Sequence, residues 1–262
     1  MSNNYNLGVD LSPIQVVVDE IRAVDVPNLG AAIIAGALTE KQKSLLGVGV
    51  HPGFSDYFNT MGHNVNPDAT NWNVREEGNG ECICNKYFAD KPGYLYCRSG
   101  DLTGESGIAT TSLKQSFSLK NGVTSINYES RVNFDWTADN GNNCGLGFHV
   151  ISTAGLMSLD HLVDPVRYIV SIVVHDQVPT AFTSDGAIIQ TTDLSAYISN
   201  GVDFTILVVI SKTDVKFYVN GMIGATHATR VPDAVWYFAV GTTCKNDSVQ
   251  YTRIEKIEIW GE

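Results

Sequence analysis

The chain has 262 residues, of which 44% are hydrophobic and 17% are charged, and its formal net charge is -11. This composition is typical of an ordered globular protein and excludes a disordered chain or a coiled coil. The small number of lysines and arginines argues against nucleic acid as a partner, because few cations are available to replace the counterions of the phosphates.

Residues 1–65 differ in character from the rest of the chain. Ser12-Pro13-Ile14-Gln15 has the pattern of a capping box and predicts a helix from about Pro13 to Val24. Thr39-Glu40-Lys41-Gln42 is a second capping box and predicts another short helix. The apolar run Leu29–Leu38 is about half as long as a bilayer span. We therefore expect no membrane span and a partly helical arm whose small residues allow close packing.

This arm carries too little bulky apolar surface to fold alone. It is expected to dock on the domain that follows, on a second copy of the chain or on other subunits of a larger assembly, and we favour the assembly. The start of the chain, Met1–Asn6, is polar and uncharged with no apolar segment behind it, which is unlike a signal peptide. We therefore expect the protein to lie at the surface of a virion or of another extracellular particle, which it reaches without a secretory signal.

From about Asn71 onward, short β-rich runs alternate with turns rich in Gly, Asn, Asp and Pro. The candidate strands are Glu81–Phe88, Tyr94–Arg98, Ile108–Ser112, Gln115–Leu119, Ser125–Trp136, Gly145–Ser152, Val166–His175, Ala181–Thr183, Ala187–Thr191, the three strands of Asp203–Thr226, Trp236–Thr242 and Val249–Trp260. The pattern predicts a mostly β protein: a two-sheet antiparallel jelly-roll sandwich over residues 66–262, preceded by the partly helical N-terminal arm over residues 1–65.

The clearest local signals lie in three consecutive runs near residue 210. Phe204–Ser211 is rich in Val and Ile and predicts a strand buried, or nearly buried, on both faces. In Val215–Val219, apolar and polar residues alternate, so Phe217 and its apolar neighbours are predicted to face the core. Asn220-Gly221 supplies the two positive-φ residues that a two-residue hairpin turn needs. The segment therefore predicts a three-stranded antiparallel meander.

Four stretches resemble strands of a known superfamily. They are Tyr128–Phe134, Gly145–Phe148, Val215–Gly221 and Ile254–Trp260. Together they are similar to the concanavalin A-like lectin and glucanase jelly rolls, which include the laminin-G-type domains. The resemblance covers about residues 70–262 and consists of structural motifs, so it implies the fold more than the function.

The carboxylates argue against hydrolysis. Laminarinase-type members of this superfamily carry Glu-x-Asp-x-x-Glu or Glu-x-Asp-x-Glu on one strand, because retaining hydrolysis needs carboxyl groups about 5 Å apart. No such run follows Phe148. Glu76-Glu77 is predicted to lie in a loop, and Glu255 and Glu258 are three residues apart on a strand and are expected on opposite faces. We therefore expect no enzyme of this type, whereas a polysaccharide lyase, which would use Tyr, His and Arg, stays open.

Candidate ligand-binding residues lie along the predicted strand Ser125–Trp136. Sugar binding needs aromatic rings that stack on the apolar side of a pyranose and Asn, Asp or Arg side chains that bind its hydroxyls. The candidates are Tyr128, Arg131, Asn133, Asp135 and Trp136. Alternation places the three polar residues on one face of the strand and the two aromatic residues on the other. The aromatic residues can therefore lie in the same site as the polar ones only through a bulge or at the ends of the strand. The alternative is an ordinary solvated face.

Two other sets of residues have the chemistry of a possible site. The loop Asp139–Asn143 is rich in oxygen ligands and could hold Ca²⁺ through Asp139, Asn140 and Asn142, although any tight turn uses the same residue types. No other cofactor is expected. His149 and His175 each border an apolar strand and are predicted to be core or capping residues rather than catalytic ones.

The cysteines are odd in number and lack the CxxC spacing typical of zinc sites. They are Cys82, Cys84, Cys97, Cys144 and Cys244. We interpret them as small buried hydrophobic residues, with disulfides as the alternative. Cys82 and Cys84 are two apart and point to one face of a strand, which suits separate partners on a neighbouring strand better than a bond between the two.

These features favour a non-enzymatic structural or adhesive protein. In this interpretation a lectin-like jelly roll is displayed by residues 1–65 on a multisubunit particle, as a phage or virus decoration, head-fibre or tail protein, and binds cell-surface glycans. The alternative is a carbohydrate-active enzyme, either a polysaccharide lyase or a glycoside hydrolase, or a free lectin.

Overall fold

The computed structural model describes residues 54–56, 58, 66–84, 94–111, 117–119, 123–137, 141–150, 159–229, 231, 234–245 and 247–262. The two predicted arm helices, at Pro13–Val24 and from Thr39, lie outside these residues. Among the residues described, no helix has both the length and the apolar character needed to cross a membrane.

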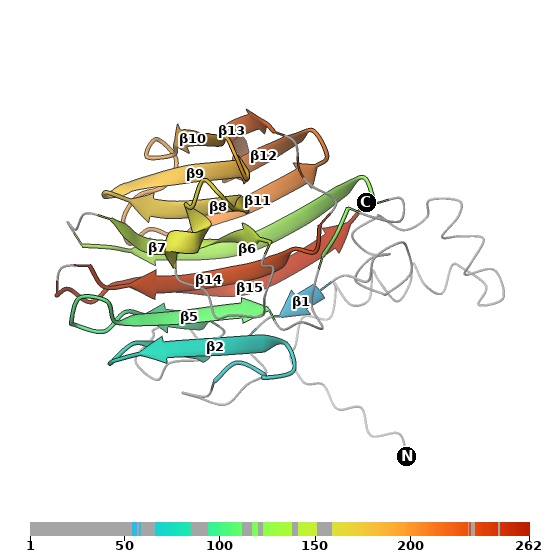
Figure 1. The fold of residues 1–262 in the computed structure, drawn as a ribbon. Coiled ribbons are helices and arrows are strands. Elements are labelled where there is room, and N and C mark those ends of the chain that lie inside the picture. The colour runs from blue at the N-terminus through green and yellow to red at the C-terminus, as the bar shows by residue number, and fades with distance from the viewer. Residues whose placement is uncertain are drawn as a thin grey trace, which may run out of the picture.

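Two antiparallel sheets pack face to face, and Figure 1 looks onto their faces, with one sheet behind the other. Sheet A contains, in spatial order, β13 (Met222–Ala228), β12 (Asp214–Val219), β11 (Phe204–Ser211), β6 (Ser125–Asp135), β15 (Tyr251–Gly261), β4 (Leu95–Arg98) and β3 (Glu81–Cys84), and β1 (Phe54–Asp56) also pairs with β15. Sheet B contains β10 (Ile189–Asp193), β9 (Val178–Asp185), β8 (Tyr168–His175), β7 (Asn142–His149), β14 (Tyr237–Thr243), β5 (Ser106–Thr111) and β2 (Trp72–Glu77). The predicted mostly β, two-sheet antiparallel jelly-roll sandwich is confirmed.

The predicted meander forms strands β11, β12 and β13. Alternate residues of β12, among them Phe217, are fully buried between the sheets, as predicted. Asn220 and Gly221 adopt φ angles of 51° and 77°, which confirms the hairpin turn. A register shift between Phe217 and Tyr218 adds one irregularity to the pairing of β12 with β13.

Two strand predictions were wrong. Phe204–Ser211 is not buried on both faces: only its alternate residues, beginning with Phe204, are buried, because an antiparallel sheet in a two-layer sandwich has one wet face. Glu76-Glu77, predicted to lie in a loop, ends strand β2, which pairs with β5. Trp72 begins this strand and is buried against Phe54 and Phe238.

Residues just before the predicted domain boundary also belong to the sandwich. Strand β1 pairs with the second half of β15, with Phe54 opposite Ile259, and Phe54 and Phe58 are core residues. The Trp72 indole N–H donates a hydrogen bond to Asp56 at 2.8 Å. The boundary between residues 65 and 66 stays a prediction, but these contacts fasten residues 54–56 and 58 to the domain.

The outer face of sheet B is partly covered. The short 3₁₀ helix η2 (Leu159–Leu162) lies over β7 and β8, as Figure 1 shows. Leu159 and Leu162 form a second apolar cluster with side chains of sheet B. Gly147 lies under this layer, where an added Cβ would come within 2.5 Å of the Ser171 Cβ. On sheet A, by contrast, several polar side chains of the outer face reach solvent.

Candidate functional site

The predicted polar residues project from the outer face of sheet A. Val132 and Phe134 of β6 point into the core, so Arg131, Asn133 and Asp135 face outward, as alternation predicts. The neighbouring strand β15 places Arg253 opposite Asn133 and Tyr251 opposite Asp135. The outward row of β6 therefore lies beside an arginine and a tyrosine that had not been assigned to the site.

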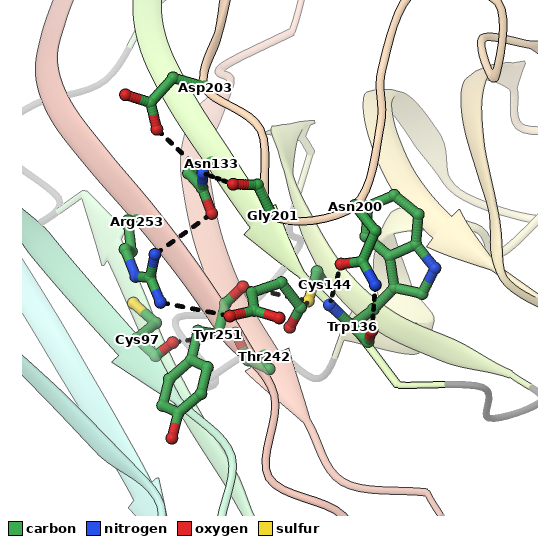
Figure 2. A network of polar contacts seen from close by, with 11 residues as sticks. Cys97, Asn133, Trp136, Cys144, Asn200, Gly201, Asp203, Thr242, Tyr251 and Arg253 are labelled. Atoms are coloured by element: carbon green, nitrogen blue, oxygen red, sulfur yellow. Dashed lines mark hydrogen bonds and ion pairs between the residues drawn. The ribbon is translucent and has the colours of Figure 1, made fainter.

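Arg253 connects this row, as Figure 2 shows. Its guanidinium donates to the Asn133 side-chain oxygen at 3.4 Å and to the Asp135 carboxylate at 3.3 Å. The Asn133 amide in turn donates to the Asp203 carboxylate and to the Gly201 carbonyl, both at 2.9 Å (Figure 2). Asn133 is only 2% exposed, and these bonds use both its oxygen and its nitrogen. The network thus fixes the side chains before any ligand arrives.

Two tyrosine rings complete the group. The Tyr96 and Tyr251 ring centroids are 5.1 Å apart, and the Arg253 guanidinium carbon lies 5.6 Å from the first and 5.4 Å from the second. Such contacts are favourable cation–π interactions. Tyr96 is buried, which raises the pKa of its hydroxyl, and the adjacent Tyr251 adds to the effect. We call Tyr96, Asn133, Asp135, Tyr251 and Arg253 the Arg253 patch.

A second ion-pair group lies beside the patch. Arg131 contacts the Asp203 carboxylate at 3.0 Å and the Glu255 carboxylate at 3.1 Å. Glu255 is the most important cause of the raised pKa of Arg131. Because the Arg131 and Glu255 side chains are 45% and 40% exposed, their ion pair adds little to stability. The two contacts nevertheless limit how far Arg131 is free to bind a ligand.

The two predicted aromatic ligand-binding residues are elsewhere. Tyr128 is fully buried, with its ring 4.7 Å from Phe238 and 5.9 Å from Phe148, and burial raises the pKa of its hydroxyl. This burial removes Tyr128 from the predicted binding surface. Trp136 packs partly against the core, and its backbone N–H donates to the Asn200 side chain at 2.9 Å (Figure 2). Tyr251 supplies the aromatic surface instead.

The expected separation of Glu255 and Glu258 was wrong. The register of β15 against β6 shifts between Ile254 and Lys256, so one extra residue enters the strand. Ile254 and Ile257 both face the core across this bulge. Glu255 pairs with outward-facing Arg131, and Glu258 pairs with Lys256 at 3.2 Å. Both carboxylates therefore lie on the outer face of sheet A.

The remaining predicted sites are placed only in part. Asp139 and Asn140 of the predicted calcium loop lie outside the described residues, and so does the side chain of Asn142. Within the part of the chain that is described, no group of three or more His, Cys, Asp or Glu side chains could hold a metal ion.

His149 and His175 differ in their surroundings. His149 is buried, which agrees with the predicted core or capping position: it is 1% exposed, and neither ring nitrogen has a hydrogen-bond partner among the described residues. Burial, with smaller contributions from nearby His161 and Arg167, lowers its pKa to about 3. His175 lies at the exposed end of β8, 3.5 Å from the Asp176 carboxylate. Burial thus removes His149 from any surface site.

The two sheets and their strand order have the concanavalin A-like jelly-roll fold, which this chain shares with solved structures of lectins and glucanases. Comparison with known sequences gave no match to a protein-family model and no match to a curated protein.

Solved structures supply the particular likenesses. The carbohydrate recognition domain of Emp47p superposes with a TM-score of 0.54 at 16% identity, over 80% of this chain and 94% of that one. Laminarinase from Flavobacterium sp. UMI-01 gives 0.51 at 14% identity, over 79% and 98% of the two chains. Peanut lectin gives 0.52 at 9% identity, over 80% and 97%. At these identities the likeness shows the fold.

Proposed function

We propose that this protein is a lectin-like adhesive protein that binds glycans at the Arg253 patch and does not cleave them. The observation that carries the proposal is the fixed guanidinium of Arg253, which contacts two tyrosine rings and hydrogen-bonds to Asn133 and Asp135. An aromatic face beside planar donors and acceptors is the chemistry that recognises a pyranose.

Each side chain of the patch has a distinct task in this proposal. The partly exposed ring of Tyr251 stacks on the apolar face of a sugar. The Asp135 carboxylate, 43% exposed, accepts hydrogen bonds from sugar hydroxyls, and the free N–H groups of Arg253 donate to the ring or hydroxyl oxygens. Because the contacts within the patch hold these groups in place, little side-chain entropy is lost on binding.

Replacing Arg253 with methionine tests this assignment. Methionine keeps much of the side-chain volume but removes the charge and every donor, so we expect binding to the best ligands of a printed glycan array to weaken at least about tenfold. Lys216→Met is the matched control, because Lys216 is a partly exposed cation of the same sheet that pairs with Asp214 of its own strand. Equal binding by the wild type and Arg253→Met would contradict the proposal.

We further propose that residues 1–65 attach the domain to a multisubunit particle, such as a phage or virus decoration, head-fibre or tail structure at the virion surface. Support comes from the composition of the arm, which has too little apolar surface to fold alone. Display in many copies would raise a weak single-site affinity by about 10²–10⁴.

Light scattering on the purified full chain tests the proposed role of the arm. We expect oligomers, because the arm buries its apolar run against other copies when no other subunits are present. A monomer whose residues 1–65 resist protease would contradict the attachment role and favour an arm that docks on its own domain.

One observation favours the alternative, a glycoside hydrolase. The bulge in β15 brings Glu255 and Glu258 to one face, and Glu258 is only 5% exposed. Incubating the array ligands with the protein and measuring new reducing ends decides between the two functions. We expect none. Cleavage that disappears in Glu255→Gln or Glu258→Gln would establish the hydrolase instead.

A further inference from the structure

Two cysteines face each other at the edge of sheet A. Cys82 of β3 and Cys97 of β4 are directly opposite in the antiparallel register, and both are fully buried. Their sulfur atoms are 2.7 Å apart. This separation is only about 0.65 Å longer than the roughly 2.05 Å of an S–S bond.

The backbone already meets the requirement for such a bond. Directly opposed residues of an antiparallel pair have Cα atoms about 4.5–5.5 Å apart, inside the range of about 4.4–6.8 Å that disulfides span. Cys84 lies two residues along β3, opposite Leu95 rather than a cysteine. Cys144 points to the Tyr251 carbonyl at 3.3 Å. Among the described contacts, only Cys82 and Cys97 bring two sulfurs together.

We propose that Cys82 and Cys97 form a disulfide bond between β3 and β4 by exchange with a small-molecule disulfide. The thiolate of one cysteine attacks the reagent RSSR, forms a mixed disulfide and releases one RSH. The second thiolate then attacks the protein sulfur of that mixed disulfide and releases the second RSH. Both electrons and both thiol protons pass to the reagent, and no metal or further oxidant is needed.

Burial determines when the bond forms. Desolvation raises the pKa of Cys82, and the adjacent Cys97 raises it further, so the reactive thiolate is scarce in the folded chain. We therefore expect exchange as the chain folds, or when β3 opens locally. Because β3 ends sheet A in the strand order, the bond would fasten an edge strand to its neighbour.

Mass spectrometry tests the proposal. The full chain is refolded with oxidised glutathione or with dithiothreitol, its remaining thiols are alkylated, and the intact mass is measured before digestion with trypsin. We expect the glutathione sample to carry three alkylated thiols and, after allowance for those three groups, to be two hydrogen masses lighter than the reduced chain. We also expect a tryptic peptide pair that links Cys82 to Cys97. Its midpoint of urea unfolding is expected to lie above that of the reduced sample.

Two variants locate the bond. Cys84→Ser is the matched control, because Cys84 lies on the same strand face, and we expect it to keep the cross-link to Cys97. Cys82→Ser is expected to lose the cross-link. Five alkylated thiols in the refolded wild type, or a link from Cys84 to Cys97, would overturn the proposal.

Discussion

Replacing Phe217 with alanine is expected to lower the free energy of unfolding by about 3–5 kcal/mol. Phe217 is fully buried on β12, between Val208 and Ala225 of the neighbouring strands. Its ring centroid lies 5.5 Å from that of His227, which itself bridges the two sheets. Truncation leaves a cavity where sheets A and B meet, and urea unfolding followed by fluorescence measures the loss.

The adjacent residue gives the matched control. Tyr218 points to the outer face of the same strand and is partly exposed. We expect Tyr218→Ala to change the free energy of unfolding by less than about 1 kcal/mol. A small loss at Phe217 together with a large loss at Tyr218 would mean that the faces of β12 are reversed, because a shift of one residue exchanges the two faces of a strand.

Acidification is the second large effect. Burial keeps His149 neutral in the folded state with a pKa of about 3, whereas an unfolded histidine titrates near 6.5. Between pH 6.5 and pH 3, His149 binds a proton in the unfolded state but stays neutral in the folded state. The stabilising contribution of neutral His149 is therefore present above pH 6.5 and is lost as the pH falls toward 3. We expect His149 alone to lower the free energy of unfolding, relative to its value at neutral pH, by about 2 kcal/mol at pH 5 and about 4 kcal/mol at pH 3.

Urea unfolding at pH 7.5, 6 and 5 measures this dependence. His227 acts in the same direction, because burial lowers its pKa while its ring nitrogens contact Thr183 and Thr192. His149→Leu should therefore reduce the loss between pH 7.5 and 5 by about 2 kcal/mol without abolishing it. An unaltered pH dependence in His149→Leu would contradict this account.

Local signals in the sequence predicted much of the fold. Alternation in Val215–Val219 predicted the buried face of β12, and Asn220-Gly221 predicted its turn, because both depend on neighbouring residues alone. Trp72–Glu77 escaped prediction because its polar end, Glu76-Glu77, is typical of a loop. Tertiary pairing with β5 determines its conformation instead.

The site was predicted less completely, because it depends on contacts between distant parts of the chain. Alternation placed Arg131, Asn133 and Asp135 on one face. It could not place Arg253 opposite Asn133, because the register of β15 is set by packing. The bulge that moves Glu255 and Glu258 to one face also leaves no clear trace in the sequence.

The central claim is that a glycan binds at the Arg253 patch, and an NMR titration tests it most directly. The ¹⁵N-labelled protein is titrated with the tightest ligand from the glycan array, and backbone amide shifts are followed. We predict that the largest shifts lie at Asn133, Asp135, Tyr251 and Arg253. Shifts concentrated on the outer face of sheet B, around Tyr237 and His161, would contradict the claim.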